Sequence, residues 1–502
     1  MVGILALPTE LLRVIALHLR QRHDLNCLSR TCSRLCQVVC PILYQNDISA
    51  YSLQWAVKRE VIGTFHRALD AGVDVAEACG RFHLLHLAAR LGRLTALGAL
   101  LNIDGVDVDQ RNGDSQTALH LAVASRSLTA IQMLLDANAN LALPMPGGWT
   151  AIHIASQSPD TDVVELLLKH GADVNARYDD SGTPLMIAAA LAPTEMMKFL
   201  IDSGADCNAA TMSGLTALHI ASMRKKVAAQ ELLIMNGASI DAMNDEGMTG
   251  LMLAATAGDT MAVSRLLDLG AVVDKASDNG VTALAWAAQN GRAATAGMLI
   301  ERGADVNFRA EGDCTALMFA TAKGSIDTVR VLLNNGAMVD AAATDGCTAL
   351  LFAAAHDRAE IFDLLLAHGP DIDLQEQSGK TALIATAMNN NVPIAKKLLQ
   401  RGAKTEIKSD SGSTALHEAI SGGFPNMVRI LLRWGANVAA NTDAGEGSLQ
   451  MAMRLRRTKI ARLIRTYTER ADCASRLSGH HESHDEAFER GIEDIRTLWP
   501  SI

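Results

Sequence analysis

The sequence predicts an all-α solenoid, a fold in which short helical units of one kind stack side by side. Two observations predict it. Threonine recurs at intervals of 33 residues, and each threonine precedes a run of small and apolar residues, as in TALHLAV and TAIHIAS. A Gly-Ala pair follows most of these threonines after 21 residues, as at Gly171-Ala172. The pattern recurs in phase ten times and therefore indicates a repeat array; it begins at Thr117, Thr150, Thr183, Thr216, Thr249, Thr282, Thr315, Thr348, Thr381 and Thr414.

Each repeat reads as a helix, a second helix and a projecting turn. The threonine hydroxyl accepts from a free backbone N–H, so the first helix starts there, and small residues such as Ala122 and Ala155 allow a neighbouring helix to approach closely. Asp160 is a suitable N-cap for a second helix, and Gly171 is suitable for the left-handed residue that ends it. The polar run 244–247 has turn residues. One repeat alone cannot bury its apolar face, so stacked copies share a continuous core.

The period and motif resemble the ankyrin repeat, whose pattern is Thr-Pro/Ala-Leu-His-x-Ala-Ala followed by Gly-Ala. Pro184 keeps the proline after threonine. The motif histidine occurs at His120, His153, His219 and His417. These histidines occupy a fixed slot at the helix start, so we interpret them as hydrogen-bonding scaffold and not as catalytic groups.

Composition limits the class of function. The net charge of −10 and the sequence pI near 5.8 argue against a general nucleic-acid binder. Nine cysteines without CxxC spacing indicate a reducing cytosol or nucleus, so we expect a cytoplasmic or nuclear protein. The first residues do not read as a signal peptide, and no 18 apolar residues run together, so no membrane span is expected.

Residues 1–48 break the repeat pattern. In order they contain L-P-x-E-L-L-x-x-I, D-L, T-C-x-x-L and P-x-L-Y, and this segment resembles the F-box in the form common in fungal proteins. The resemblance implies docking on the Skp adaptor of a cullin–RING ubiquitin ligase. It implies an adaptor-facing set of Leu7, Pro8, Leu11, Ile15, Leu25 and Leu28. The alternative for some of these residues is that they form the module's own small core instead. The alternative is that these helices only cap the solenoid.

Four cysteines in the same segment raise the question of zinc: Cys27, Cys32, Cys36 and Cys40. Structural zinc sites usually use CxxC-type knuckles between non-helical elements. We therefore expect these thiols to pack as small hydrophobes and predict no metal site.

The array is expected over residues 49–470. Residues 49–116 are two degenerate first repeats, 117–446 are ten regular repeats, and 447–470 form a terminal cap rich in arginine and lysine. That basic run is either a solvated cap or a nuclear import signal. Residues 471–502 are predicted as a flexible tail with an apolar stripe, which is either a short helix folding back or a partner motif: Phe488, Ile492, Ile495 and Trp499.

No catalytic motif is present: the sequence lacks a phosphate-binding glycine loop, HExxH, a nucleophile elbow and a strand followed by GxGxxG. We predict no catalytic residue, cofactor or small-molecule ligand.

Binding is predicted from the residue before each threonine, a position that the ankyrin resemblance places in a concave groove. It holds Trp149, Leu215, Met248, Val281, Cys314 and Cys347. Eight residues after threonine, a second groove position holds Arg224, Asn290, Lys323 and His356. These side chains either recognise a target or pack on one another along the turns. A third column, four residues after threonine, is assigned mainly to the core: Trp286, Phe319 and Phe352.

Together these patterns predict a binding subunit of a ubiquitin ligase that presents a target protein and performs no chemistry itself. The alternative is an ankyrin scaffold without a ligase.

Overall fold

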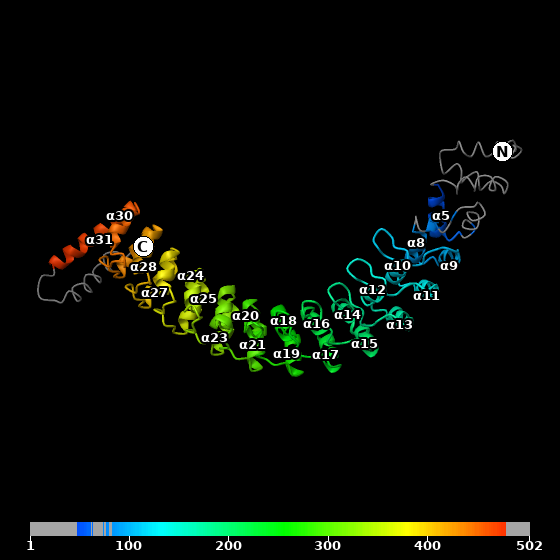
Figure 1. Ribbon diagram of the computed structural model, residues 1–502. Helices are drawn as coiled ribbons and strands as arrows, with labels where there is room; N and C mark the ends of the chain where they lie inside the picture. Colours follow the sequence, from blue (N-terminus) through cyan, green and yellow to red (C-terminus); the bar gives the residue numbers. More distant parts are fainter. Residues whose placement is uncertain (1–47, 62, 64–73, 75–76, 80–82, 478–502) are drawn as a thin grey trace, which may run out of the picture. The chain divides into compact units, whose positions relative to one another are not determined.

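The computed structural model describes residues 48–61, 63, 74, 77–79 and 83–477. The described chain consists of short helices that follow one another in pairs, with a projecting turn after each pair (Figure 1). Within these residues no strand forms, and only isolated bridges such as Ala342–Thr348 close the bases of turns. The predicted F-box and most of the predicted tail lie outside the described residues. The chain divides between Ser239 and Ile240 into two compact units, each a stack of helix pairs.

In the first unit, α5 packs on the first helix pair, α8 and α9, and later pairs stack in sequence order. Its helices are α5 (Ile48–Arg59), α8 (Leu84–Leu91), α9 (Leu94–Leu101), α10 (Ala118–Ala124), α11 (Leu128–Asp136), α12 (Ala151–Ala155), α13 (Thr161–Lys169), α14 (Pro184–Leu191), α15 (Thr194–Asp202), α16 (Ala217–Met223) and α17 (Val227–Met235).

The second unit continues the same alternation. Its helices are α18 (Gly250–Ala257), α19 (Thr260–Asp268), α20 (Ala283–Gln289), α21 (Ala293–Glu301), the 3-10 turn η1 (Glu311–Asp313), α22 (Ala316–Lys323), α23 (Ile326–Asn334), α24 (Ala349–Ala355), α25 (Ala359–Ala367), α26 (Ala382–Met388), α27 (Val392–Gln400), α28 (Ala415–Gly422), α29 (Pro425–Arg433), α30 (Ser448–Arg454) and α31 (Thr458–Leu477). The last helix continues past residue 470, where the sequence pattern placed the end of the cap.

The expected helix starts and stops are confirmed at the positions that the sequence singled out. The Thr348 hydroxyl accepts from the N–H of Leu351, and the Asp160 carboxylate accepts from that of Asp162. Gly171 has a φ of +90°, the left-handed conformation that ends α13. Thr183 and Thr315 differ, because their buried hydroxyls have no hydrogen-bond partner.

The core consists of thin layers of small and aliphatic side chains. Ala122, Ala188 and Ala221 are fully buried on the first helices of their repeats. The second helices contribute Leu167 and Phe362, which are also fully buried. Because alanine leaves room at the contact, neighbouring first helices such as α14 and α16 pack directly on each other.

A ladder of Asn and Asp side chains joins consecutive repeats, and sequence reasoning missed it. The Asn175 side chain accepts from the N–H of Asp206 at 2.8 Å, and Asn307 accepts likewise from Met338 at 2.8 Å. These acceptors lie 25 residues after a repeated threonine, so the 33-residue period carries the signal. Ala142 occupies the same phase and has no acceptor to offer.

Candidate functional site: the turns and the exposed face of the first helices

The projecting turns form the framework of the site, and we call the six residues before each repeated threonine a finger. Neighbouring fingers are joined through their backbones. The N–H of Met212 donates to the Asp180 carbonyl at 3.0 Å in the first unit, and the N–H of Thr344 donates to the Gly312 carbonyl at 2.8 Å in the second. Each of these bonds spans the same number of residues, so side chains of equal phase occupy the same place on successive fingers. We call the residues directly before threonine the turn column.

In the first unit, the turn column is built around two stacked aromatic rings. Trp149 is half-buried, and its ring lies 5.5 Å from that of Tyr178 and 6.0 Å from that of His153, measured between ring centroids. In the next repeat the column position is Gly182, and a Cβ added there would collide with the Tyr178 ring. Tyr178 therefore fills the place that glycine leaves empty, and half-buried Leu215 follows it on the next finger.

Sequence reasoning named Trp149 but missed Tyr178. The available signal was Gly182, the one glycine at a column position among the ten regular repeats. Burial raises the pKa of the Tyr178 hydroxyl, and the nearby Asp180 carboxylate adds to the rise. The phenol is therefore neutral at physiological pH and offers a ring face and a hydrogen-bonding tip.

Beside this column, the first unit exposes large apolar side chains at the ends of the first helices. Leu191 at the end of α14 is 57% exposed, and Met223 at the end of α16 is 52% exposed. The Lys226 ammonium donates to the Ala192 carbonyl at 2.8 Å, which brings these two helix ends together. Arg224, the exposed C-cap of α16, therefore lies next to an apolar strip.

In the second unit, the turn column is apolar over part of its length. Met248 is only 5% exposed, so it offers a partner little surface. The next three fingers carry half-buried Val281, Cys314 and Cys347.

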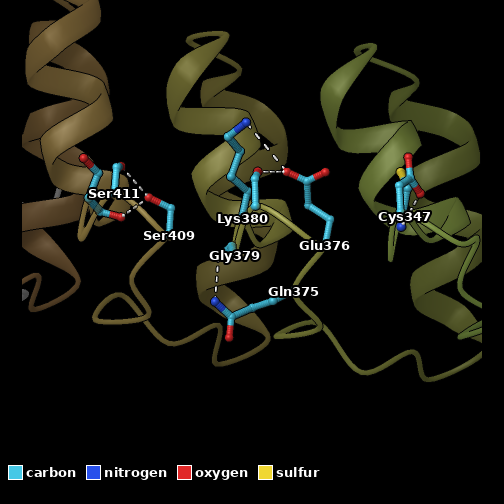
Figure 2. A network of polar contacts seen from close by, with 10 residues as sticks. Cys347, Gln375, Glu376, Gly379, Lys380, Ser409 and Ser411 are labelled. Atoms are coloured by element: carbon cyan, nitrogen blue, oxygen red, sulfur yellow. Dashed lines mark hydrogen bonds and ion pairs between the residues drawn. The ribbon is translucent and has the colours of Figure 1, made fainter.

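The column then becomes polar. Lys380 occupies the next position, and its ammonium lies 3.6 Å from the Glu376 carboxylate (Figure 2). Figure 2 also shows Gln375 at the base of this finger, where its amide donates to the Gly379 carbonyl at 2.6 Å. The same amide donates to the Lys408 carbonyl at 2.9 Å, which ties the finger to its neighbour.

The aromatic column in this unit is only partly buried. Trp286, Phe319 and Phe352 are half-buried, so the assignment of this column mainly to the core holds only in part. The reason is helical geometry: residues one, two, five and six positions after threonine face neighbouring helices, which leaves the fourth and eighth on the outward face.

The predicted polar residues lie beside this aromatic column. His356 is exposed, and its ring lies 4.3 Å from that of Phe352, centroid to centroid. The Asn290 amide donates to the Trp286 carbonyl at 2.9 Å, and Lys323 is exposed at the end of α22. The outward face of α20, α22 and α24 thus combines ring surfaces with donors and positive charge.

The thiols on this face are not activated. Burial, with the Asp345 and Glu376 carboxylates, raises the pKa of Cys347 to about 11. Burial also raises the pKa of Cys314. Since the thiolate is the reactive form, these cysteines act at neutral pH as apolar contact surface and not as nucleophiles.

The motif histidines are structural hydrogen-bonding groups. The N–H of Thr150 donates to Nδ1 of His153 at 3.1 Å, so Nδ1 accepts and the proton of the neutral ring sits on Nε2. Nε2 then donates to the Ala176 carbonyl at 3.0 Å, at the base of the next finger. Burial lowers the pKa of His153, which keeps the ring in this neutral form.

No group of three or more His, Cys, Asp or Glu side chains in the described part of the chain could hold a metal ion. None of the described helices has the length and apolar character that a membrane crossing requires.

Comparison with known proteins agrees with this architecture. The family model described as ankyrin repeats (3 copies) matches residues 85–178, 176–244, 218–310, 309–376 and 360–442. No curated protein matches the sequence. The family matches cover more than half of the chain, and the fold they imply is the one described above, so the chain belongs to the ankyrin-repeat family.

Proposed function

We propose that this chain is a target-binding subunit whose fingers and exposed helix faces hold another protein. The observation that carries the proposal is the alignment of half-buried aromatic and apolar side chains on consecutive repeats, with polar side chains beside them. Core residues are explained by packing, but the aromatic residues Trp286, Phe319 and Phe352 are only half-buried in three consecutive repeats. Interfaces concentrate binding energy in such large, partly exposed anchors.

We further propose that residues 1–48 act as an F-box, so that the whole chain is the substrate receptor of an SCF-type cullin–RING ubiquitin ligase. The motif carries this step, and its adaptor-facing residues, from Leu7 to Leu28, lie outside the described residues. The receptor itself would perform no catalysis. It would hold the target near a ubiquitin-loaded enzyme and raise the effective concentration of its lysines.

The alternative function is an ankyrin scaffold in which the first helices only cap the array. Both functions place the protein in the cytoplasm or nucleus, and both use the same groove. They differ in the Skp adaptor, which only the ligase receptor binds.

The experiment that separates them is co-purification of the full chain with the Skp adaptor. Replacing Leu11 and Ile15 by aspartate should abolish adaptor binding, since a buried aliphatic side chain contributes about 1.5–3 kcal/mol and a buried charge is unfavourable. The matched control is Leu191→Asp with Met223→Asp, which charges exposed apolar residues of the array instead. Undiminished adaptor recovery with the first double variant would contradict the ligase function. Proximity labelling with and without residues 1–48 would then identify targets of the groove alone.

A further inference from the structure

Among the described residues, the last helix pair of the second unit has an open face that the preceding repeats bury. Met453 on α30 is 56% exposed. Its counterparts at the same phase are all fully buried: Ala255, Ala288, Thr321, Ala354, Ala387 and Ile420. On α31, Ala461 is half-buried, whereas the equivalent Val428 and Phe362 are fully buried. The open face therefore consists of the surface that a following repeat would cover.

Basic side chains lie on and near this open face. The Arg465 guanidinium contacts the Met453 sulfur at 3.7 Å, which places it over the face itself. Three more basic residues are exposed, Arg456 in the connection between α30 and α31 and Lys459 and Arg462 on α31. None of them has a carboxylate partner among the described residues. Only Arg454 is neutralised, by Glu446 at 2.6 Å. The surface thus suits an occupant that is apolar on one side and acidic on the other.

The chain contains a segment with that character in residues 485–499, which lie outside the described residues. Phe488, Ile492, Ile495 and Trp499 recur at the spacing of one helical face. The segment has two arginines and five acidic residues, the latter being Asp485, Glu486, Glu489, Glu493 and Asp494.

The connection is long enough for this segment to return to the open face. α31 ends at Leu477, and residues 478–484 span up to about 24 Å when extended. A reversal between antiparallel helices needs only about 2–5 residues. A helix over residues 485–499 is about 22 Å long, so a return alongside α31 would bring Trp499 within about one turn of Ala461 and Arg465.

We propose that residues 485–499 bind as an amphipathic helix to the open face of α30 and α31, antiparallel to α31. The apolar stripe covers Met453 and Ala461, and the carboxylates lie near Arg465 and the other basic side chains of this helix pair. Gly491 in the middle of the segment disfavours an isolated helix, so the helix forms on docking. This inference is independent of the function proposed for the groove.

The test is oxidation of single methionines by dilute hydrogen peroxide, followed by peptide mass spectrometry on the full chain. Met453 and Met338 are almost equally exposed without the docked segment, at 56% and 60%. Docking should make Met453 oxidise about tenfold more slowly than Met338, the ratio given by a docking free energy of about 1.4 kcal/mol. The double variant Ile492→Asp with Trp499→Asp should remove the difference and leave the Met338 rate unchanged.

The matched control is Thr497→Asp, which adds a charge on the opposite side of the proposed helix. It should keep Met453 protected, whereas high salt should weaken the protection by screening the ion pairs. Equal oxidation of Met453 and Met338 in the native chain would overturn the proposal. Protection of Met453 that persists in the double variant would also overturn it. Protection that disappears on dilution would overturn it as well, because it would show that a second copy of the chain covers the face.

Discussion

Replacement of Trp149 by alanine tests whether the aromatic pair of the first unit is a binding anchor or only packing between fingers. Trp149 is half-buried and contacts the rings of Tyr178 and His153. Removing the indole forfeits an aromatic pair of about 0.5–1.5 kcal/mol and about half of the 1.5–3 kcal/mol of a fully buried side chain. The local stability loss is therefore about 2 kcal/mol. If Trp149 is also an anchor, target binding falls by a further 2 kcal/mol or so.

Two measurements separate these contributions. Hydrogen exchange of α12–α14 reports the local stability, and proximity-labelling recovery of targets reports binding. Trp149→Phe keeps a ring against Tyr178, so it should retain most of the stability while losing the wider contact surface of the indole. Lys169→Ala on α13 is the control, because its exposed ammonium pairs with Glu165 of the same helix. If Trp149→Ala lowers the local stability but leaves the labelled proteins unchanged, the pair is packing and the target binds elsewhere.

Two further predictions concern stability. Gly237 has a φ of +87° and open space around an added Cβ, so Gly237→Val should lower the free energy of unfolding by about 1–2 kcal/mol through the backbone alone. An alanine at Gly412 would also collide with Asp443 and should lower it further. Hydrogen exchange should show each loss of stability confined to the adjacent repeats. Burial lowers the pKa values of His153 and His417 in the folded state. The unfolded state therefore binds more protons than the folded state once the pH falls below about 6.5. The thermal midpoint should be flat above neutrality and should fall with acidification through the lowered folded pKa values. His153→Gln should flatten this decline, because glutamine can make the same backbone hydrogen bond without titrating in this range, as Gln450 does when it accepts from the N–H of Gly447. An unchanged pH profile would contradict the assignment of the decline to the buried histidines.

Much of the fold was predictable because the 33-residue period imposes the same local physics ten times. Thr348 begins its helix, Gly171 ends one and Ala122 lies in a close helix contact, and each follows from residue chemistry at a fixed phase. The Asn175 ladder has the same periodicity, but its hydrogen bonds join different repeats. Such contacts are visible in the sequence only as a recurring amide or carboxylate, without the partner that explains it.

The candidate site was less predictable, because surface columns vary while the core phases stay fixed. Tyr178 lies four residues before Gly182 in the sequence, outside the column phase. Only the folded structure shows that its ring occupies the space that a side chain at position 182 would fill. Met248 has the phase of an exposed contact but is buried. Phase therefore predicts the position of a residue on the repeat, while its exposure depends on the size and direction of the neighbouring side chains.

The change in the turn column of the second unit bears on where a target binds. Lys380 occupies a column position, and Glu446 occupies the equivalent position before Gly447. Each is held by an ion pair, Lys380 to Glu376 of the same finger and Glu446 to Arg454 at the end of the following helix α30. Their charges are thus satisfied internally, although exposed pairs of this kind contribute little to stability. Val281 and Cys314, in contrast, are half-buried column residues that form no ion pair. The aromatic residues of α20, α22 and α24 lie on neighbouring repeats. A partner that buries apolar surface gains most on the fingers before Lys380, so we expect the target contacts of the second unit to end there.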